Sequence, residues 1–180
     1  MEHFFYRNGE LHSEGVSIAK IAKNVQTPLY IYSKLAMETQ FKKLTSALKL
    51  VKHKVFYSVK ANSNISVLKV FQSLGAGMDV VSAGEYARAV AAGVSGDDIV
   101  FSGVGKTKSE IQKVILGGIR QFNIESEPEL DLIESLAKEM GKVINISIRV
   151  NPDVNAKTHK KITTGTRSDK FGVSFEQARM

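Results

Sequence analysis

A lysine stands at the end of the most strand-like run of the chain. Residues 55–59 are mainly β-branched and aromatic, and they lead into Lys60 and then into the polar turn Ala61-Asn62-Ser63-Asn64. A short run of this composition, closed by Asn and Ser, predicts a buried strand. Two interpretations of Lys60 stay open. Its stem could carry the amine to solvent, or the amine could form a Schiff base with a cofactor, since a desolvated lysine loses its proton readily.

Polar side chains lie at the ends of all five strand-like runs. After Lys60 they are Asp79 with Ser82, Gly84 and Glu85, then Ser102-Gly103, then Asn123, Glu125 and Ser126, and finally Arg149, Asn151 and Asp153. Each one alone is more typical of a loop start or a helix cap than of a catalytic group. Because the carboxyl ends of parallel barrel strands form one mouth, five such ends together favour an active site there.

The strands and helices that would position these groups repeat at a regular interval along the sequence. Strand-like runs begin near Val55, Met78, Ile99, Gln121 and Val143, and predicted helices span 65–74, 83–92, 108–116 and 127–140. This alternation predicts βαβ units and a parallel sheet. The turn after the first strand lacks G-x-G-x-x-G, which favours a (β/α)8 TIM-like barrel over a dinucleotide-binding sheet. A full barrel takes about 250 residues, so the five or so βα units predict a partial barrel, truncated after its N-terminal part.

The first 27 residues form a separate N-terminal segment in this interpretation, and the barrel portion spans 28–180. Residues 6–11 predict a turn between two short extended pieces, and 17–23 have a helical pattern. Residues 27–32 predict a strand opened by proline. Ser33 then predicts the cap of a helix that extends to about Val51.

Composition narrows the class of protein. The 180 residues are 43% hydrophobic, which is typical of a globular domain. The net charge of +7 comes from scattered basic residues without an aromatic-rich basic patch, so a solvated surface is favoured over a nucleic-acid footprint. The absence of cysteine excludes disulfides and fits a cytoplasmic protein. No apolar run is long enough to span a membrane, and the start lacks a secretion signal.

The motif Tyr57-Ser58-Val59-Lys60-Ala61-Asn62-Ser63-Asn64 resembles the cofactor-lysine motif of the fold-type III pyridoxal-phosphate decarboxylases, which are built on an alanine racemase-type barrel. The similarity covers nearly the whole chain, through segments 6–11, 27–32, 75–85, 101–107, 122–127, 149–154 and 159–172. The last segment separates the chain from ornithine and arginine decarboxylases. Within the family, the chain is similar to the members that convert meso-diaminopimelate to L-lysine and CO2.

The resemblance implies pyridoxal 5′-phosphate as the cofactor, with Lys60 as its Schiff-base lysine. Asp79 and Glu85 match carboxylates near the cofactor, and Arg149 matches an arginine near its ring. The active-site loop that closes over the substrate is implied to contain His159, Lys161, Thr163, Gly165 and Lys170. The family also implies a homodimer and a β-rich second domain, against which residues 1–27 would pack. The motifs that complete the site lie outside these 180 residues, so the chain alone is expected to be inactive.

Several alternatives stay open beside that interpretation. The chain could be a non-catalytic pyridoxal-phosphate-binding barrel of vitamin homeostasis, a decarboxylase of ornithine or arginine, or a regulatory relative without cofactor. Asp79 could be a structural carboxylate paired with Lys60 or Arg149. Segment 159–172, rich in Lys, Thr and Gly, could be a solvated surface loop.

Overall fold

The strands of the repeating part pair in the order in which they occur in the sequence. The computed structural model describes residues 3–154, 164 and 171–179. It joins β4 (Phe56–Ser58), β5 (Gly77–Val80), β6 (Ile99–Phe101), β7 (Gln121–Ile124) and β8 (Ile146–Ile148) into one sheet, and each neighbouring pair is parallel. This order is that of consecutive barrel strands, so the predicted partial barrel is confirmed.

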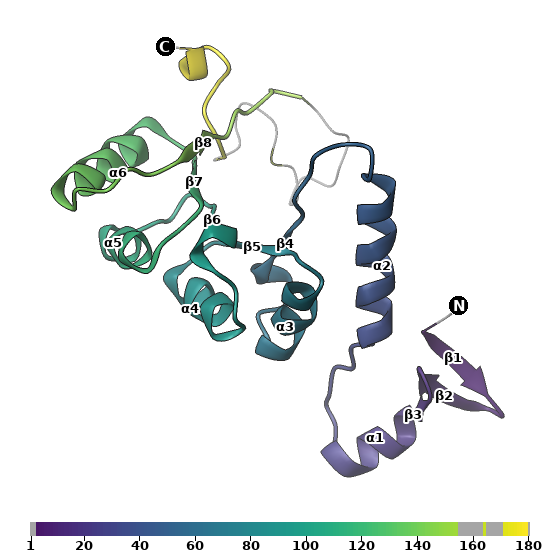
Figure 1. Cartoon of the computed structure of the whole chain (residues 1–180). Coiled ribbons are helices and arrows are strands. Elements are labelled where there is room, and N and C mark those ends of the chain that lie inside the picture. The colour runs from purple at the N-terminus through teal and green to yellow at the C-terminus, as the bar shows by residue number, and fades with distance from the viewer. Residues whose placement is uncertain (1–2, 155–163, 165–170, 180) are drawn as a thin grey trace.

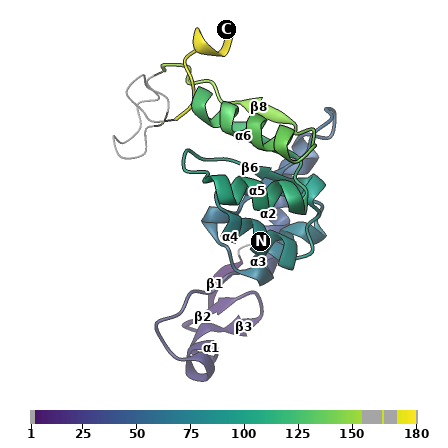
Figure 2. The same ribbon diagram turned by 90° about the vertical axis from the view of Figure 1, so that its left-hand side faces the viewer.

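Four helices connect these strands and cover one side of the sheet (Figures 1 and 2). They are α3 (Ile65–Ser73), α4 (Ala83–Ala91), α5 (Lys108–Gly117) and α6 (Glu127–Glu139), and all four lie within one residue of their predicted bounds. Three short 3-10 turns accompany them: η1 (Val59–Ala61), η2 (Gly96–Asp98) and η3 (Gln177–Arg179). Consecutive helices pack on one another, as right-handed βαβ crossovers require.

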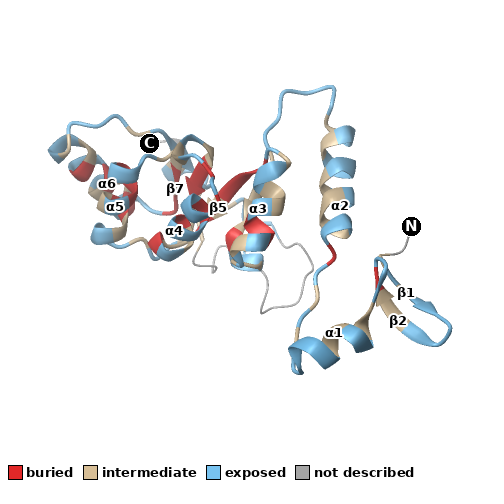
Figure 3. Cartoon of the chain, turned by 60° about the horizontal axis from the view of Figure 1, so that its bottom comes forward, coloured by how far each residue is buried: buried red, intermediate tan, exposed pale blue. Residues whose placement is uncertain are grey.

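Alternation along the strands separates an apolar face from a polar one. The side chains that face the helices are almost completely buried: Met78, Val80, Ile99, Phe101, Phe122 and Ile124. Successive strand side chains point to opposite faces, so the register Ser58↔Asp79↔Val100↔Gln121 occupies the other, concave face. Figure 3 shows burial concentrated in the sheet and the helix surfaces turned toward it. The core therefore lies between sheet and helices, and the concave face remains available for chemistry.

Gly77 leaves room for an aromatic ring on that concave face. It is paired with Phe56 across β4 and β5. A Cβ atom at this position would lie 2.5 Å from the Phe56 ring and 2.7 Å from the carbonyl oxygen of Asp98. Any larger residue would therefore displace Phe56 or η2, since core neighbours cannot move apart without cost.

The N-terminal segment is a small sheet followed by one helix, and a second helix comes after the segment. β1 (Phe4–Arg7), β2 (Glu10–Ser13) and β3 (Val16–Ser17) are antiparallel, and α1 (Ile18–Val25) and α2 (Lys34–Ala47) follow. The predicted turn within 6–11 is confirmed at Asn8-Gly9, where both residues have positive φ. The Glu14 carboxylate accepts hydrogen bonds from the Ser33 hydroxyl (2.7 Å) and the Leu35 N–H (2.9 Å), which ties this segment to the start of α2.

Three local predictions were wrong. Residues 27–32 form no strand: no described residue pairs with them in a sheet, and Tyr30 is 91% exposed. An extended run becomes a strand only when a neighbour completes its hydrogen bonds. α2 ends at Ala47 rather than Val51. The N–H groups of Leu48 and Lys49 donate to carbonyl oxygens only three residues earlier, and these tight turns end the helix. β8 begins at Ile146 rather than Val143, whose side chain is 98% exposed in the loop after α6.

The β8 side of the sheet has few covering contacts in the described part of the chain. Beyond its pairing with β7, a single parallel bridge joins Val150 to Val173 just after β8. Ile146 and Ile148 are 41% and 42% exposed, unlike their buried counterparts on the inner strands. Among residues 3–154, 164 and 171–179, no helix has the length and apolarity needed to cross a membrane.

Glu110 links the first turns of two neighbouring helices. Its carboxylate accepts hydrogen bonds from the Thr107 N–H (3.1 Å), which closes a capping box on α5, and from the Ala83 N–H (2.9 Å) at the start of α4. The bond from Ala83, followed by those from Thr107, lowers the pKa of Glu110 below its ordinary value of 4.5. A lowered folded-state pKa stabilises the protein above pH 4.5, and that stabilisation is lost as the pH falls through the folded-state pKa.

We therefore expect Glu110→Gln to lower the free energy of unfolding by roughly 0.5–1 kcal/mol at pH 7, a modest value because solvent screens this partly exposed group. The difference from the parent protein should shrink as the pH falls below the ordinary value of 4.5 and through the lowered pKa of Glu110. Urea unfolding at several pH values measures it. Glu134→Gln, at an exposed position of α6, is the matched control. A difference that stays constant from pH 7 to pH 3 would contradict the assignment.

Candidate cofactor and active site

Lys60 lies in η1, directly after β4, and its side chain is exposed. The backbone around it is held from both sides. Val59 is completely buried, and the Asn64 side chain accepts a hydrogen bond from the Ser66 N–H (2.9 Å) that caps α3. No hydrogen bond or ion pair joins the Lys60 amine to another residue in the described part of the chain. The backbone that carries the side chain is therefore held at the strand end, and the amine remains accessible for reaction.

A row of hydrogen-bonded polar side chains crosses the concave face. We call it the polar belt, and it consists of Ser58, Asp79, Ser102, Asn123 and Gln121. The Asp79 carboxylate accepts from the hydroxyls of Ser58 (3.3 Å) and Ser102 (2.5 Å). The Asn123 amide donates to the Ser102 oxygen (2.8 Å) and accepts from Gln121 (2.9 Å). The belt joins four strands and holds Asp79 from two sides.

The belt borders a cavity of about 310 Å³. Asp79, Ser102 and Asn123 line it, together with Phe56, Val100, Arg120 and Gln121. Lys60 and Arg149 do not line it. In the described residues, Asp79 makes no ion pair with either of them and is held by hydroxyl groups instead.

Glu85 is engaged locally at the start of α4. Its carboxylate accepts a hydrogen bond from the Val81 N–H (2.8 Å), and its own N–H donates to the hydroxyl of the N-cap residue Ser82 (3.2 Å). The bond from the Glu85 N–H to Ser82 caps α4, and the Glu85 carboxylate holds the residue before that cap. They fix the turn that follows β5, and the role of Glu85 beside a cofactor stays a prediction.

A fully buried ion pair lies behind the ends of β6 and β7. The Lys106 side chain has no exposed surface, and its ammonium donates to Glu129 (2.5 Å) and to the carbonyl oxygens of Gly103 (2.7 Å) and Asn123 (2.8 Å). Glu129 also accepts from the Glu125 N–H (3.3 Å). Sequence reasoning gave Lys106 and Glu129 no role, because charged residues are ordinarily exposed. No local signal marked the pair, because Lys106 and Glu129 are 23 positions apart in the sequence.

Arg149 follows β8 and contacts a carboxylate and a ring. Its Nη1 lies 3.1 and 3.2 Å from the two carboxylate oxygens of Glu125. Its guanidinium carbon lies 4.8 Å from the centre of the Phe171 ring, at cation–π distance. The Arg149 side chain keeps 40% of its surface exposed, so part of its guanidinium can reach a ligand.

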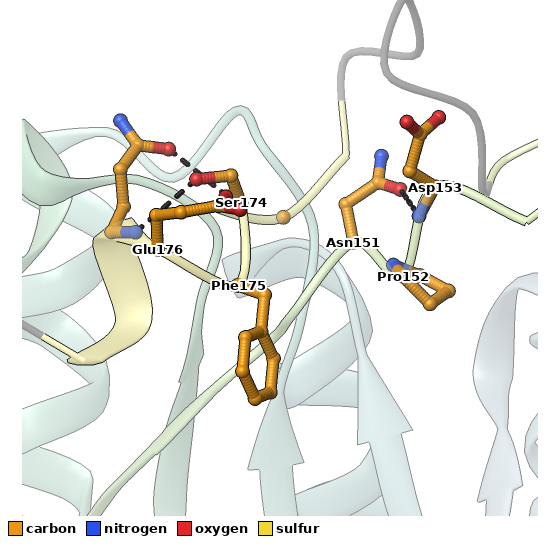
Figure 4. Close-up of a pocket in the computed structure, with 8 residues that line it drawn as sticks. Asn151, Pro152, Asp153, Ser174, Phe175 and Glu176 are labelled. Carbon is orange, nitrogen blue, oxygen red and sulfur yellow. Dashed lines mark hydrogen bonds between the residues drawn. The ribbon is translucent and has the colours of Figure 1, made fainter.

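A second cavity, of about 500 Å³, lies beyond Arg149 between two segments (Figure 4). One wall is Asn151, Pro152 and Asp153, and the other is Gly172 with residues 174–177. Reciprocal bonds between Asn151 N–H and Val173 O (2.7 Å) and between Val173 N–H and Arg149 O (2.9 Å) join the segments. The predicted loop residues His159, Lys161, Thr163, Gly165 and Lys170 lie outside the described residues.

The donor set on this side of the sheet fits pyridoxal phosphate. An accessible primary amine stands at the end of β4, a carboxylate held by two hydroxyls lies on the neighbouring strand, and a partly exposed guanidinium follows β8. A carbonyl cofactor with anionic groups needs an amine for covalent attachment and cationic or hydrogen-bonding partners for its oxygens. Parallel barrel strands with an accessible lysine amine at the end of one strand are the arrangement that a barrel needs in order to hold a carbonyl cofactor on a lysine.

The chain belongs to the family described as pyridoxal-dependent decarboxylase, pyridoxal binding domain, whose model matches residues 35–180. Among curated relatives, a diaminopimelate decarboxylase of Pseudomonas fluorescens is 48% identical over 179 residues, which is 99% of this chain and 43% of the relative. The enzyme of the same name from Pseudomonas aeruginosa is 44% identical over 178 residues, with the same coverage. The chain thus spans less than half the length of these relatives.

Solved structures agree with these sequence matches. A diaminopimelate decarboxylase of M. jannaschii in complex with L-lysine is 37% identical with a TM-score of 0.89, covering 98% of this chain and 42% of that one. The Helicobacter pylori enzyme with L-lysine is 41% identical with a TM-score of 0.86, covering 89% and 41%. An arginine decarboxylase of Paramecium bursaria Chlorella virus, at 22% identity and a TM-score of 0.72, shares the fold.

The buried pair of Lys106 and Glu129 gives a stability prediction. Lys106→Met removes one charge and leaves the Glu129 carboxylate buried without its cation, so the free energy of unfolding should fall by about 3–5 kcal/mol. Lys138→Met is the matched control, because Lys138 pairs with Glu134 at 2.7 Å on the exposed surface of α6. That change should cost no more than about 1 kcal/mol. Urea unfolding measures both, and equal losses would contradict a special role for the buried pair.

Proposed function

We propose that this chain provides the cofactor-attachment part of a pyridoxal-phosphate-dependent decarboxylase that converts meso-diaminopimelate to L-lysine and CO2. The observation that carries the proposal is the accessible Lys60 amine at the end of β4. It occurs in a chain that is 44–48% identical, over 99% of its length, to diaminopimelate decarboxylases of two Pseudomonas species. The lysine bound in two similar solved structures is the product expected of that reaction.

Lys60 would hold the cofactor covalently through its side-chain nitrogen, and Asp79, Glu85 and Arg149 would lie around it. Bound pyridoxal phosphate supplies an electron sink for the carbanion that remains when CO2 leaves an amino acid. The carboxylate of Asp79, held by the Ser58 and Ser102 hydroxyls, presents a fixed acceptor. Arg149 can donate N–H groups in a planar fork to anionic oxygens of cofactor or substrate.

The remaining parts of the proposal come from the family. His159, Lys161, Thr163, Gly165 and Lys170 would belong to a loop that closes over the substrate. The complete protein would be a cytoplasmic homodimer with its sites at the subunit interface and no nucleic-acid or membrane partner. Residues 1–27 would pack against a β-rich domain. The 180-residue chain alone would neither bind the cofactor tightly nor release CO2.

The test is an assay of the complete product of the gene that encodes this chain, with meso-diaminopimelate, ornithine and arginine as substrates. We expect CO2 release from meso-diaminopimelate only. Lys60→Ala and Lys60→Arg should each lower kcat by roughly a thousandfold or more, because the covalent attachment point is lost in both, although Lys60→Arg keeps the charge. Lys69→Ala, at an exposed lysine of α3, controls for loss of a surface amine.

Two of the alternative functions have their own outcomes in this assay. Tight cofactor binding without CO2 release from any of the three substrates would indicate a non-catalytic pyridoxal-phosphate-binding barrel of vitamin homeostasis. Turnover of ornithine or arginine in place of meso-diaminopimelate would reassign the substrate. Activity that survives Lys60→Ala would contradict the role of Lys60.

A further inference from the structure

Glu125 is a buried carboxylate shared by three segments of the chain. It follows β7 directly, and its side chain is only 2% exposed. It accepts hydrogen bonds from the Gly103 N–H after β6 (3.1 Å), from Arg149 Nη1 after β8 (3.1 and 3.2 Å) and from the Gly172 N–H (3.1 Å). Two donors are backbone amides and the third is a cation, so Glu125 fastens these segments at one point.

Charge balance identifies Arg149 as the essential partner of this carboxylate. A buried charge is costly unless a counter-charge and hydrogen bonds compensate it. Lys106, the other nearby cation, is already paired with Glu129 at 2.5 Å, and Glu129 also accepts from the backbone N–H of Glu125. In the described part of the chain, Arg149 is the one cation in contact with the Glu125 carboxylate.

The contacts also restrict the arginine. One guanidinium nitrogen is shared by both Glu125 oxygens, while the guanidinium lies over the Phe171 ring, 4.8 Å from its centre. A guanidinium held on two sides keeps one orientation for its remaining N–H donors. Gly172, beside Phe171, is bound to the same carboxylate, and a Cβ atom there would lie 2.7 Å from the carbonyl oxygen of Arg149.

We propose that Glu125 is a positioning residue that sets the orientation in which Arg149 meets the cofactor. Through its hydrogen bond from the Gly172 N–H, Glu125 also couples that orientation to segment 171–179. The inference rests on the proposed function for what Arg149 contacts. The coupling itself rests on the hydrogen bonds among Glu125, Arg149 and Gly172. Glu125 touches neither substrate nor cofactor in this account and acts through Arg149.

Glu125→Gln tests the coupling with little change of shape. A carboxamide replaces one acceptor oxygen by a donor, so it cannot accept from Gly103, Arg149 and Gly172 together. We expect hydrogen exchange of the Gly172 amide in the complete gene product to accelerate on the order of tenfold, as for a lost buried hydrogen bond. Arg149→Gln, which leaves Glu125 buried without its cation, should accelerate the same amide. Asp131→Asn, the same chemical change at an exposed site of α6, should not.

A double-mutant cycle tests the action through Arg149. Titration of pyridoxal phosphate, followed by absorbance, should show about tenfold weaker binding in Glu125→Gln and little further change when Glu125→Gln is added to Arg149→Gln. Equal weakening in both backgrounds would overturn the positioning role, as would Gly172 exchange insensitive to both single changes. A parent protein that binds no pyridoxal phosphate would contradict the proposed function, and the exchange comparison would still decide whether Glu125 holds Arg149 and Gly172 together.

Discussion

Parallel register, with its two-residue alternation, is the constraint from which the rest of this structure follows. It turns Met78, Ile99 and Phe122 toward the helices and Asp79 and Gln121 toward the concave face. A shift of one residue in any strand would exchange the two faces and bury the polar belt in the apolar core. Both the apolar core and the polar belt therefore depend on the same strand pairing.

In the described part of the chain, the buried charged side chains gather near the carboxyl ends of β6, β7 and β8. Lys106 and Glu129 compensate each other, and Glu125 and Arg149 form the second pair beside them. The first pair is buried on both sides, and such a pair is a weak source of stability compared with apolar side chains of the same volume. In the second pair only Glu125 is buried, since Arg149 keeps 40% of its side chain exposed. Both pairs hold the backbone at these strand ends, because Lys106 donates to the carbonyl oxygens of Gly103 and Asn123, and Glu125 accepts from the N–H groups of Gly103 and Gly172.

The sequence predicted the parallel barrel units well because the alternating strand-like and helical periods are local signals. The bounds of α3 to α6 followed from them, and the five strands were located with an error of at most three residues. The extended run 27–32 was misassigned, because whether such a run becomes a strand depends on a partner elsewhere in the fold. The same limit applies to the site. Lys60, Asp79 and Arg149 were found at strand ends, whereas the pairing of Lys106 with Glu129 and of Glu125 with Arg149 joins residues about 24 positions apart. Local patterns carry no information about such contacts.

Lys60 is the residue proposed to attach pyridoxal phosphate. Reductive trapping tests this attachment: the complete gene product is incubated with pyridoxal phosphate, reduced with borohydride, digested and mapped by mass spectrometry. The phosphopyridoxyl mass should be found on the peptide that contains Lys60 and should be absent from that peptide in the Lys60→Arg variant. Labelling confined to another lysine, or an active enzyme with Lys60 unlabelled, would contradict it.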